Sequence, residues 1–364
     1  MNNTYIKNWE SVKGRFEQWW DRQMCNKPLM HIVASNGKTA TTQIPNESDT
    51  ENAQDKYVNV QRIIAGYRNF FETHSFLADA FPVASIDLGA GSMALYLGGE
   101  PIFKPDTVWY KEKFSNTDQF RLLSFDENNY WWKTHQSMMK EARELAKGDF
   151  FVAIPDIIEN LDILSALRGP QNLCYDIMDN PQAVHDGLKI IDDNYFNYYD
   201  RCYELLSDDD SSSVYTYYQI LGKGKVAKLQ CDFNVCISQE TFREYVIPSL
   251  TKQCRYLDRS IFHLDGPDAI RHIPALMEIN ELNALQWTPG WGNPDGGSAN
   301  WYHIYDQVKD AGKGFWISFE DSGPKDWAEN AKKLVKRYGA TGMYFIFPVF
   351  KNLNEAQEMA ALFD

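Results

Sequence analysis

Two hydrophobic periods alternate along the second half of the chain. From residue 238 onward, segments with apolar residues three or four positions apart, the period of an amphipathic helix, take turns with short apolar runs that are typical of buried strands. The apolar runs cover residues 260–265, 282–289, 314–321 and 342–349, and a helical segment follows each of them. This alternation predicts parallel strands that are covered by helices.

The rest of the chain shows a looser version of the same pattern. Its strand-like runs cover residues 28–35, 82–89, 149–156 and 229–233, which brings the predicted strands to eight. Eight is the number that closes a (β/α)8 TIM barrel. The rival, an open doubly wound sheet, usually has a Gly-x-Gly-x-x-Gly turn after its first strand, and the chain has none there. We therefore expect one α/β barrel domain over residues 1–364, with residues 1–27 as a helical extension.

Two segments have more than one interpretation. Residues 213–220 and 226–233 flank the turn-like sequence LGKGK, so they form either one bent strand or a hairpin. Residues 6–24 have a helical period, but the sequence does not say whether this helix covers the bottom of the barrel or a partner subunit. A homodimer therefore stays open.

Composition removes several classes of function. The net charge is -14 and the isoelectric point is near 5.0, whereas nucleic-acid binding needs a clustered basic surface. No apolar run approaches the ~20 residues of a membrane span, and the first residues lack the apolar core of a signal peptide. The six cysteines form no Cys-x-x-Cys pair. We expect a cytoplasmic protein with reduced thiols and a small-molecule substrate.

Chemically capable residues gather at the predicted strand ends. In a TIM barrel the active site lies at the carboxyl ends of the strands. The residues found there are Asp87, Asp156, Asp232, His263, Asp265, Trp287, Glu320 and Asp321. Most are acidic, although any single carboxylate can equally cap the next helix. Tyr217 has an amphipathic ring that can line a pocket, and Arg168 can clamp an anion or cap a helix before Gly169.

His263 and Asp265 lie two residues apart on a strand, so their side chains share a face. They can bind zinc or another divalent metal if a third ligand joins them, with Glu320 as the first candidate and Cys231 or Asp232 as others. Without a metal, Asp265 can orient His263 as a general base. A purely structural interpretation is that Asp265 closes the Asp-Gly-Pro turn and His263 is a buried, hydrogen-bonded histidine.

Three segments, in order, resemble the uroporphyrinogen decarboxylases and the related corrinoid methyltransferases. LQCDFNVCISQETFREYVIPSL is similar to the family's segment from a strand-end Asp through a Ser-containing turn to Phe, Glu and Pro. VASIDLGAGSMALYLG is similar to its second strand with an aspartate and a Gly-containing loop, and SALRGPQNLCYDIMDNPQAVHDGL to its Gly-Pro segment and the next helix start. The resemblance covers most of the chain from the second strand onward and implies a (β/α)8 barrel.

The family's functional residues carry over unevenly. Asp87 matches the decarboxylase aspartate that holds the pyrrole nitrogens, and Asp232 matches the strand-end aspartate. The decarboxylase arginine motif has no counterpart in HIVASNGKTATT, and the late His-Gly motif is replaced by GMYFIFPVFKN. The methyltransferase branch holds zinc with a His-x-Cys pair and a distant Cys. Here Asp265 stands in place of the first cysteine, which implies a harder ligand set of His263, Asp265 and Glu320.

Three hypotheses follow. In the first, the protein moves a methyl group from a small methylated compound to a corrinoid protein, with His263 and Asp265 polarising the leaving heteroatom and Asp87, Trp287 and nearby tyrosines such as Tyr217 shaping the pocket. In the second, it is a lyase that decarboxylates a small or tetrapyrrole-like substrate, with His263 as the proton donor. In the third, the barrel binds a ligand without turning it over. The decarboxylase motifs that bind substrate carboxylates are missing from the chain, and this absence favours the methyltransferase hypothesis.

Overall fold

The computed structural model describes residues 2, 4–45, 53–215, 217–320 and 322–364. Within them, the largest sheet has seven strands in the order β2 (His74–Ala78), β1 (Leu29–Ser35), β13 (Met343–Ile346), β12 (Gly314–Ser318), β11 (Ala284–Thr288), β10 (Arg259–Asp265) and β9 (Val226–Gln230). All neighbours in this sheet are parallel except β2, which pairs antiparallel with β1. The protein therefore has an α/β fold with a mostly parallel central sheet.

Further short strands lie outside the main sheet. In the described part of the chain they form three pairs: β3 (Val83–Ala84) with β6 (Phe151–Val152), β4 (Glu100–Phe103) with β5 (Val108–Lys111), and β7 (Ser212–Tyr215) with β8 (Ile220–Lys223). The first pair is parallel and the other two are hairpins. A parallel bridge between Ile154 and Tyr215 joins the end of β6 to β7.

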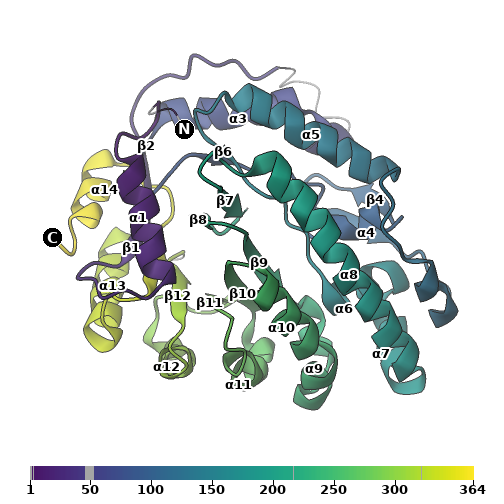
Figure 1. Ribbon diagram of the computed structural model, residues 1–364. Coiled ribbons are helices and arrows are strands. Elements are labelled where there is room, and N and C mark those ends of the chain that lie inside the picture. Colours follow the sequence, from purple (N-terminus) through teal and green to yellow (C-terminus); the bar gives the residue numbers. More distant parts are fainter. Residues whose placement is uncertain (1, 3, 46–52, 216, 321) are drawn as a thin grey trace.

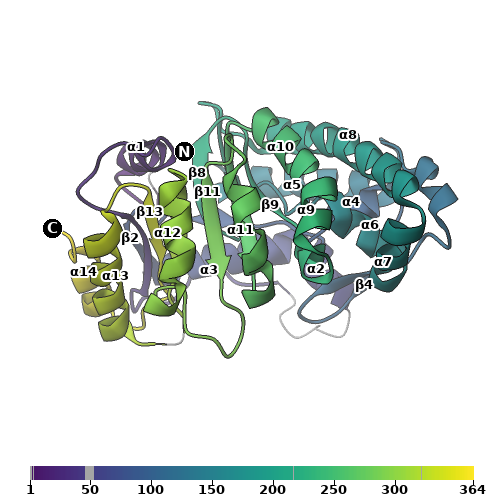
Figure 2. The ribbon, with the colours of Figure 1, turned by 90° about the horizontal axis from the view of Figure 1, so that it is seen from below.

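Helices cover the outer side of these strands (Figure 1). The helices between β2 and β9 are α4 (Ser92–Tyr96), α5 (Tyr130–Ala146), α6 (Asn160–Arg168), α7 (Pro170–Asp179) and α8 (Pro181–Leu206). Those after β9 are α9 (Gln239–Tyr245), α10 (Ile247–Tyr256), α11 (Ile273–Met277), α12 (Tyr302–Asp310), α13 (Pro324–Tyr338) and α14 (Leu353–Ala360). Seen from below, α11 and α12 run alongside β11 (Figure 2). No described helix is both long and apolar enough to cross a membrane.

The amino-terminal helix α1 (Trp9–Trp20) covers the end of the sheet where the strands begin. Trp19 donates from Nε1 to the carbonyl of Gly342, just before β13, at 2.8 Å. Trp20 donates in the same way to Leu221 at 2.7 Å. Arg259, the first residue of β10, pairs with Glu17 at 2.9 Å. The helix expected within residues 6–24 thus closes the bottom of the sheet and leaves the opposite end to the candidate site.

The strands expected from the sequence agree to different degrees with the strands in the structure. The runs at residues 28–35, 260–265, 282–289, 314–321 and 342–349 correspond to β1, β10, β11, β12 and β13. The runs at 82–89 and 149–156 are reduced to two paired residues each in β3 and β6. The hairpin consists of β7 and β8, so the first residues of LGKGK belong to its second strand and do not form the expected turn, and β9 begins at Val226. The run expected at 229–233 overlaps β9 only at Leu229 and Gln230, because a 3-10 helix begins at Asp232. Because β9 and β2 stand at the two ends of the hydrogen-bonded sheet, closure into an eight-stranded barrel stays a prediction.

Two helical segments are divided in the structure. The helical segment over residues 55–74 is divided into α2 (Ala53–Val58) and α3 (Val60–Thr73), with Asn59 as the amino-terminal cap of α3 and His74 as the start of β2. The helix expected over 238–258 breaks at Val246 into α9 and α10. Pro248 causes this break because it has no N–H for the hydrogen bond that would continue the helix.

Candidate active site

The inner face of the sheet is polar where the strands end. Register places Gln230, His263 and Gln286 side by side on β9, β10 and β11, and the row continues through Trp316 on β12. Side chains alternate between faces along a strand, so the residues between these ones face outward and pack under the helices. The outward set is apolar and buried: Leu229, Phe262, Leu264, Leu285, Trp287 and Ile317.

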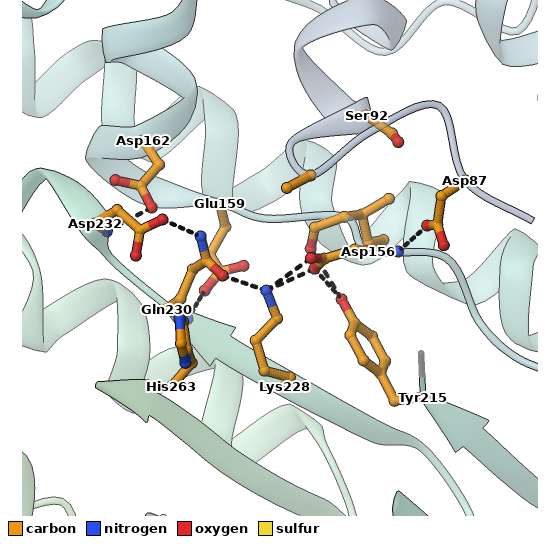
Figure 3. A network of polar contacts seen from close by, with 12 residues as sticks. Asp87, Ser92, Asp156, Glu159, Asp162, Tyr215, Lys228, Gln230, Asp232 and His263 are labelled. Carbon is orange, nitrogen blue, oxygen red and sulfur yellow. Dashed lines mark hydrogen bonds and ion pairs between the residues drawn. The ribbon is translucent and has the colours of Figure 1, made fainter. Parts of the chain in front are cut away.

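Lys228 lies at the centre of the polar cluster (Figure 3). Its ammonium nitrogen is 2.7 Å from Oδ1 of Asp156 and 2.9 Å from Oδ2, and it also donates to Oε1 of Gln230. Lys228 is 1% exposed and Asp156 3% exposed. Tyr215 donates its hydroxyl to Asp156 at 3.2 Å. The buried charge of each partner is therefore balanced by the other.

Asp87 joins the cluster from the loop after β3. The backbone N–H of Asp156 donates to Oδ1 of Asp87 at 2.7 Å, so the buried pair and Asp87 are held together. Tyr217, on the turn between β7 and β8, is 55% exposed. The charge of Asp87, followed by burial and the charge of Asp156, raises the pKa of the Tyr217 phenol. The structure thus brings Asp87, Asp156 and Tyr217 to one side of the cluster.

Asp232 lies on the other side. Its Oδ2 accepts a hydrogen bond from Gln230 Nε2 at 2.8 Å, and its own N–H donates to Asp162 at 2.8 Å. Burial and the neighbouring Asp232 raise the pKa of Asp162 to about 7. Partial removal from water, followed by the charge of Asp156, also raises the pKa of Asp232, against the opposing effect of Lys228. This side of the cluster holds carboxyl groups that keep a proton at higher pH than usual.

Glu159 is fully buried beside Gln230 (Figure 3). Its Oε1 accepts from the backbone N–H of Gln230 at 3.4 Å. Burial raises its pKa well above the ordinary value, although Lys228 opposes the shift.

His263 is fixed by a chain of side chains on the neighbouring strand. Its Nδ1 is hydrogen-bonded to Oε1 of Gln286, and Gln286 donates from Nε2 to Thr288 at 2.8 Å. An amide oxygen accepts only, so Nδ1 carries the proton and Nε2 keeps its lone pair. Burial and then Lys228 lower the pKa of His263. The pKa of Asp265 is raised, first by partial burial, with His263 opposing the shift.

Not all residues predicted from the sequence reach this cluster. Trp287 is fully buried and packs edge-on against Trp301, so its ring faces the helices. Arg168 pairs with Asp176 at 2.7 Å, and both side chains are largely buried. Its guanidinium is thus committed to a bond between α6 and α7. Glu320 accepts from Ser318 at 3.2 Å. Asp321 lies outside the described residues.

The residues present do not fit a bound metal. Within the described ranges, no three or more His, Cys, Asp or Glu side chains are grouped so that they could hold an ion. The proposed ligand set of His263, Asp265 and Glu320 therefore does not form a site in this structure, and no catalytic step is assigned to a metal.

Sequence reasoning missed several members of the cluster, namely Lys228, Gln230, Gln286, Glu159 and Asp162. Two of these had a visible signal. Lys228 and Gln230 interrupt the otherwise apolar run VAKLQ, and polar residues in a buried strand must find partners. Glu159 and Asp162 had no such signal. They lie at the start of a helix, where acidic residues are common because they interact favourably with the helix dipole.

Comparison with known proteins supports the fold. No protein-family model matches the chain. Over 97% of its length the chain is similar in structure to a methyltransferase from Methanosarcina mazei, with a TM-score of 0.63, 10% sequence identity and 98% of that protein covered. A sequence match to the tRNA-guanine(15) transglycosylase of Methanococcus aeolicus is 24% identical over 147 residues, which is 38% of this chain. The match covers 22% of the length of that curated relative.

Proposed function

We propose that the protein is a methyltransferase that moves a methyl group from a small methylated compound to a corrinoid protein. The observation that carries this proposal is the strand-end cluster, in which Asp232 and Asp265, carboxyl groups with raised pKa, flank His263. Perturbed acids and bases at the carboxyl ends of strands are typical of active sites in this kind of fold.

The comparisons and the resemblance support the reaction class. The Methanosarcina mazei methyltransferase shares the fold over nearly the whole chain. The segments that resemble uroporphyrinogen decarboxylases and corrinoid methyltransferases place Asp87 and Asp232 in this cluster. We extend the proposal to the architecture: the arc of parallel strands is a divergent TIM barrel of that superfamily. The tRNA substrate of the transglycosylase is disfavoured by the net charge of -14.

The proposed reaction is a displacement at the methyl carbon. The bond between that carbon and its heteroatom breaks, and the electron pair stays on the heteroatom. The reduced cobalt of the corrinoid partner, which is the second substrate, gives its electron pair to the methyl group. Asp232 then passes a proton to the departing heteroatom, which prevents the reverse reaction. Asp87 and Tyr217 bound the space on the other side of the cluster.

An isotope-transfer assay tests the proposal. The purified chain is mixed with cobalamin reduced to the cobalt(I) state and with methylated amines, ethers or sulfides that carry a deuterated methyl group. We expect deuterated methylcobalamin, with the rate at least ~100-fold lower in Asp232→Asn and His263→Gln. Asp268→Asn, an exposed residue three positions beyond Asp265, is the control that keeps activity.

The rival hypotheses predict other products. A lyase would release carbon dioxide from uroporphyrinogen or a small carboxylate without cobalamin, and a ligand-binding barrel would release neither product. Either result, obtained with the same preparation, would contradict the methyltransferase proposal.

A further inference from the structure

We propose that the substrate carries its methyl group on a positively charged heteroatom, as in a quaternary ammonium compound. This inference rests on the proposed function, because it names the substrate class of the same site. It is carried by three features of the cluster: an excess of carboxyl groups over cations, tyrosine rings beside those carboxyl groups, and a buried carboxyl oxygen that has no protein partner.

The charges of the cluster do not balance without a ligand. Lys228, the cation at its centre, is already bonded to Asp156 and Gln230. Asp232 receives hydrogen bonds from a neutral amide rather than a positive group. Asp265 shares a face of β10 with His263, whose Nδ1 proton is committed to Gln286. One further positive charge beside Asp265 would lower the electrostatic free energy of the group.

Aromatic rings stand beside the same carboxyl groups. Tyr218 has its ring centre 5.4 Å from that of His263 and 5.3 Å from that of Trp316, which it meets edge-on. Burial raises the pKa of Tyr218, and the next causes are the charges of Asp156, Asp232 and Asp265. The ring of Tyr218 therefore stands beside His263, on the strand that ends at Asp265. Aromatic faces and carboxylates together are the combination that binds quaternary ammonium groups.

Glu159 gives an independent sign of unmet binding capacity. It is fully buried in the cluster, beside Gln230 and Lys228 (Figure 3). Its Oε2 has no hydrogen-bond partner among the described residues. An unsatisfied buried carboxyl oxygen is costly, and such groups are found where a ligand completes the set. A cationic ligand would supply positive charge that offsets the carboxyl groups of the cluster together.

A pair of shape-matched compounds tests the charge requirement directly. Choline and 3,3-dimethyl-1-butanol have the same outline, but only choline carries a positive charge. Each is titrated by calorimetry into the chelator-treated full chain. We expect choline to bind at least about tenfold more tightly than the alcohol. Equal affinities, or no binding of choline and of tetramethylammonium, would overturn the inference.

Variants locate the binding site. Asp265→Asn and Tyr218→Leu should each weaken choline binding by roughly three- to tenfold and leave the alcohol unchanged. Asp268→Asn removes the same charge from an exposed position outside the cluster, and Tyr130→Leu removes an exposed tyrosine from α5. Both controls should bind choline like the wild type. Equal losses of choline affinity in the controls and the site variants would contradict the assignment of the binding site to this cluster. Displacement of choline by zinc or calcium would contradict it as well.

The outcomes separate this inference from the proposed function. Charge-dependent binding of choline without methyl transfer to reduced cobalamin would leave the substrate class standing and overturn the methyltransferase proposal. Methyl transfer from a neutral ether or sulfide, with no binding of cations, would overturn the substrate class and leave the methyltransferase proposal standing.

Discussion

The ion pair of Lys228 and Asp156 gives a sharp test of how the strand-end cluster is held together. Both side chains are almost inaccessible to water, at 1% and 3% exposure, and Nζ lies 2.7 Å from Oδ1. Lys228→Met keeps most of the apolar stem but removes the ammonium group. Asp156 would keep its hydrogen bond from Tyr215 and lose its compensating positive charge.

The cost follows from burial. Removing one partner of a buried pair typically costs ~3–5 kcal/mol, because the other charge is left uncompensated. We expect about 4 kcal/mol for Lys228→Met, since the bond to Gln230 is also lost. The double variant Lys228→Met/Asp156→Asn leaves no such charge, and its free energy of unfolding should return to within about 2 kcal/mol of the wild type.

Urea denaturation at pH 7, followed by circular dichroism, measures these differences. Lys225→Met is the matched control. Its nitrogen is also 2.7 Å from a carboxylate, Asp200, but the two side chains are 27% and 43% exposed, so the loss should stay below about 1 kcal/mol. The argument fails if Lys228→Met costs no more than this control, or if the double variant is no more stable than the single one.

Three further predictions follow from burial and bonding. Trp287→Phe should lower the free energy of unfolding by roughly 1–3 kcal/mol yet leave choline affinity unchanged in calorimetry, because its ring packs on Trp301; a selective loss of affinity would place the ring in the site. Burial lowers the pKa of His31 to about 4, so the unfolded chain binds a proton that the folded chain excludes. The contribution of His31 to stability should fall by up to about 3 kcal/mol between pH 6.5 and 4, and His31→Leu should remove that contribution in urea titrations at the two pH values; an unchanged pH dependence would refute the assignment. Chelator-treated protein exposed to zinc should retain less than one equivalent by mass spectrometry, equally in wild type and His263→Ala, whereas stoichiometric zinc that the variant loses would restore the metal hypothesis.

Local periodicity predicted those parts of the fold whose structure is decided locally. The run at residues 260–265 is continuous and apolar enough to form β10 almost as expected. The pairs in β3 and β6 are only two residues long, and their length is set by hydrogen bonds to distant partners rather than by pattern. The antiparallel strand β2 was not predicted, because the helical period before it continues to His74, where the strand begins.

The candidate site was predicted in outline for a related reason. The rule that active sites lie at strand ends brought Asp87, Asp156, Asp232 and His263 to one cluster without any knowledge of pairing. Choosing between Gln286 and Trp287 required the register of β11 against β10, where Gln286 stands opposite His263. A shift of one residue exchanges the two faces, and register depends on distant strands.

The polar inner face ties the site to the stability of the fold. In TIM barrels the inward-facing strand positions are usually filled by branched apolar side chains, whereas Lys228, Gln230, His263 and Gln286 occupy the inner face of this sheet. Buried polar groups are tolerated only when they bond one another, and these residues are linked through Asp156, Asp232 and Thr288. A change to one member therefore leaves another without its partner. Substitutions that keep the bonding pattern, such as Asp to Asn at the exposed tip Asp265, separate chemistry from folding more cleanly than substitutions at Lys228.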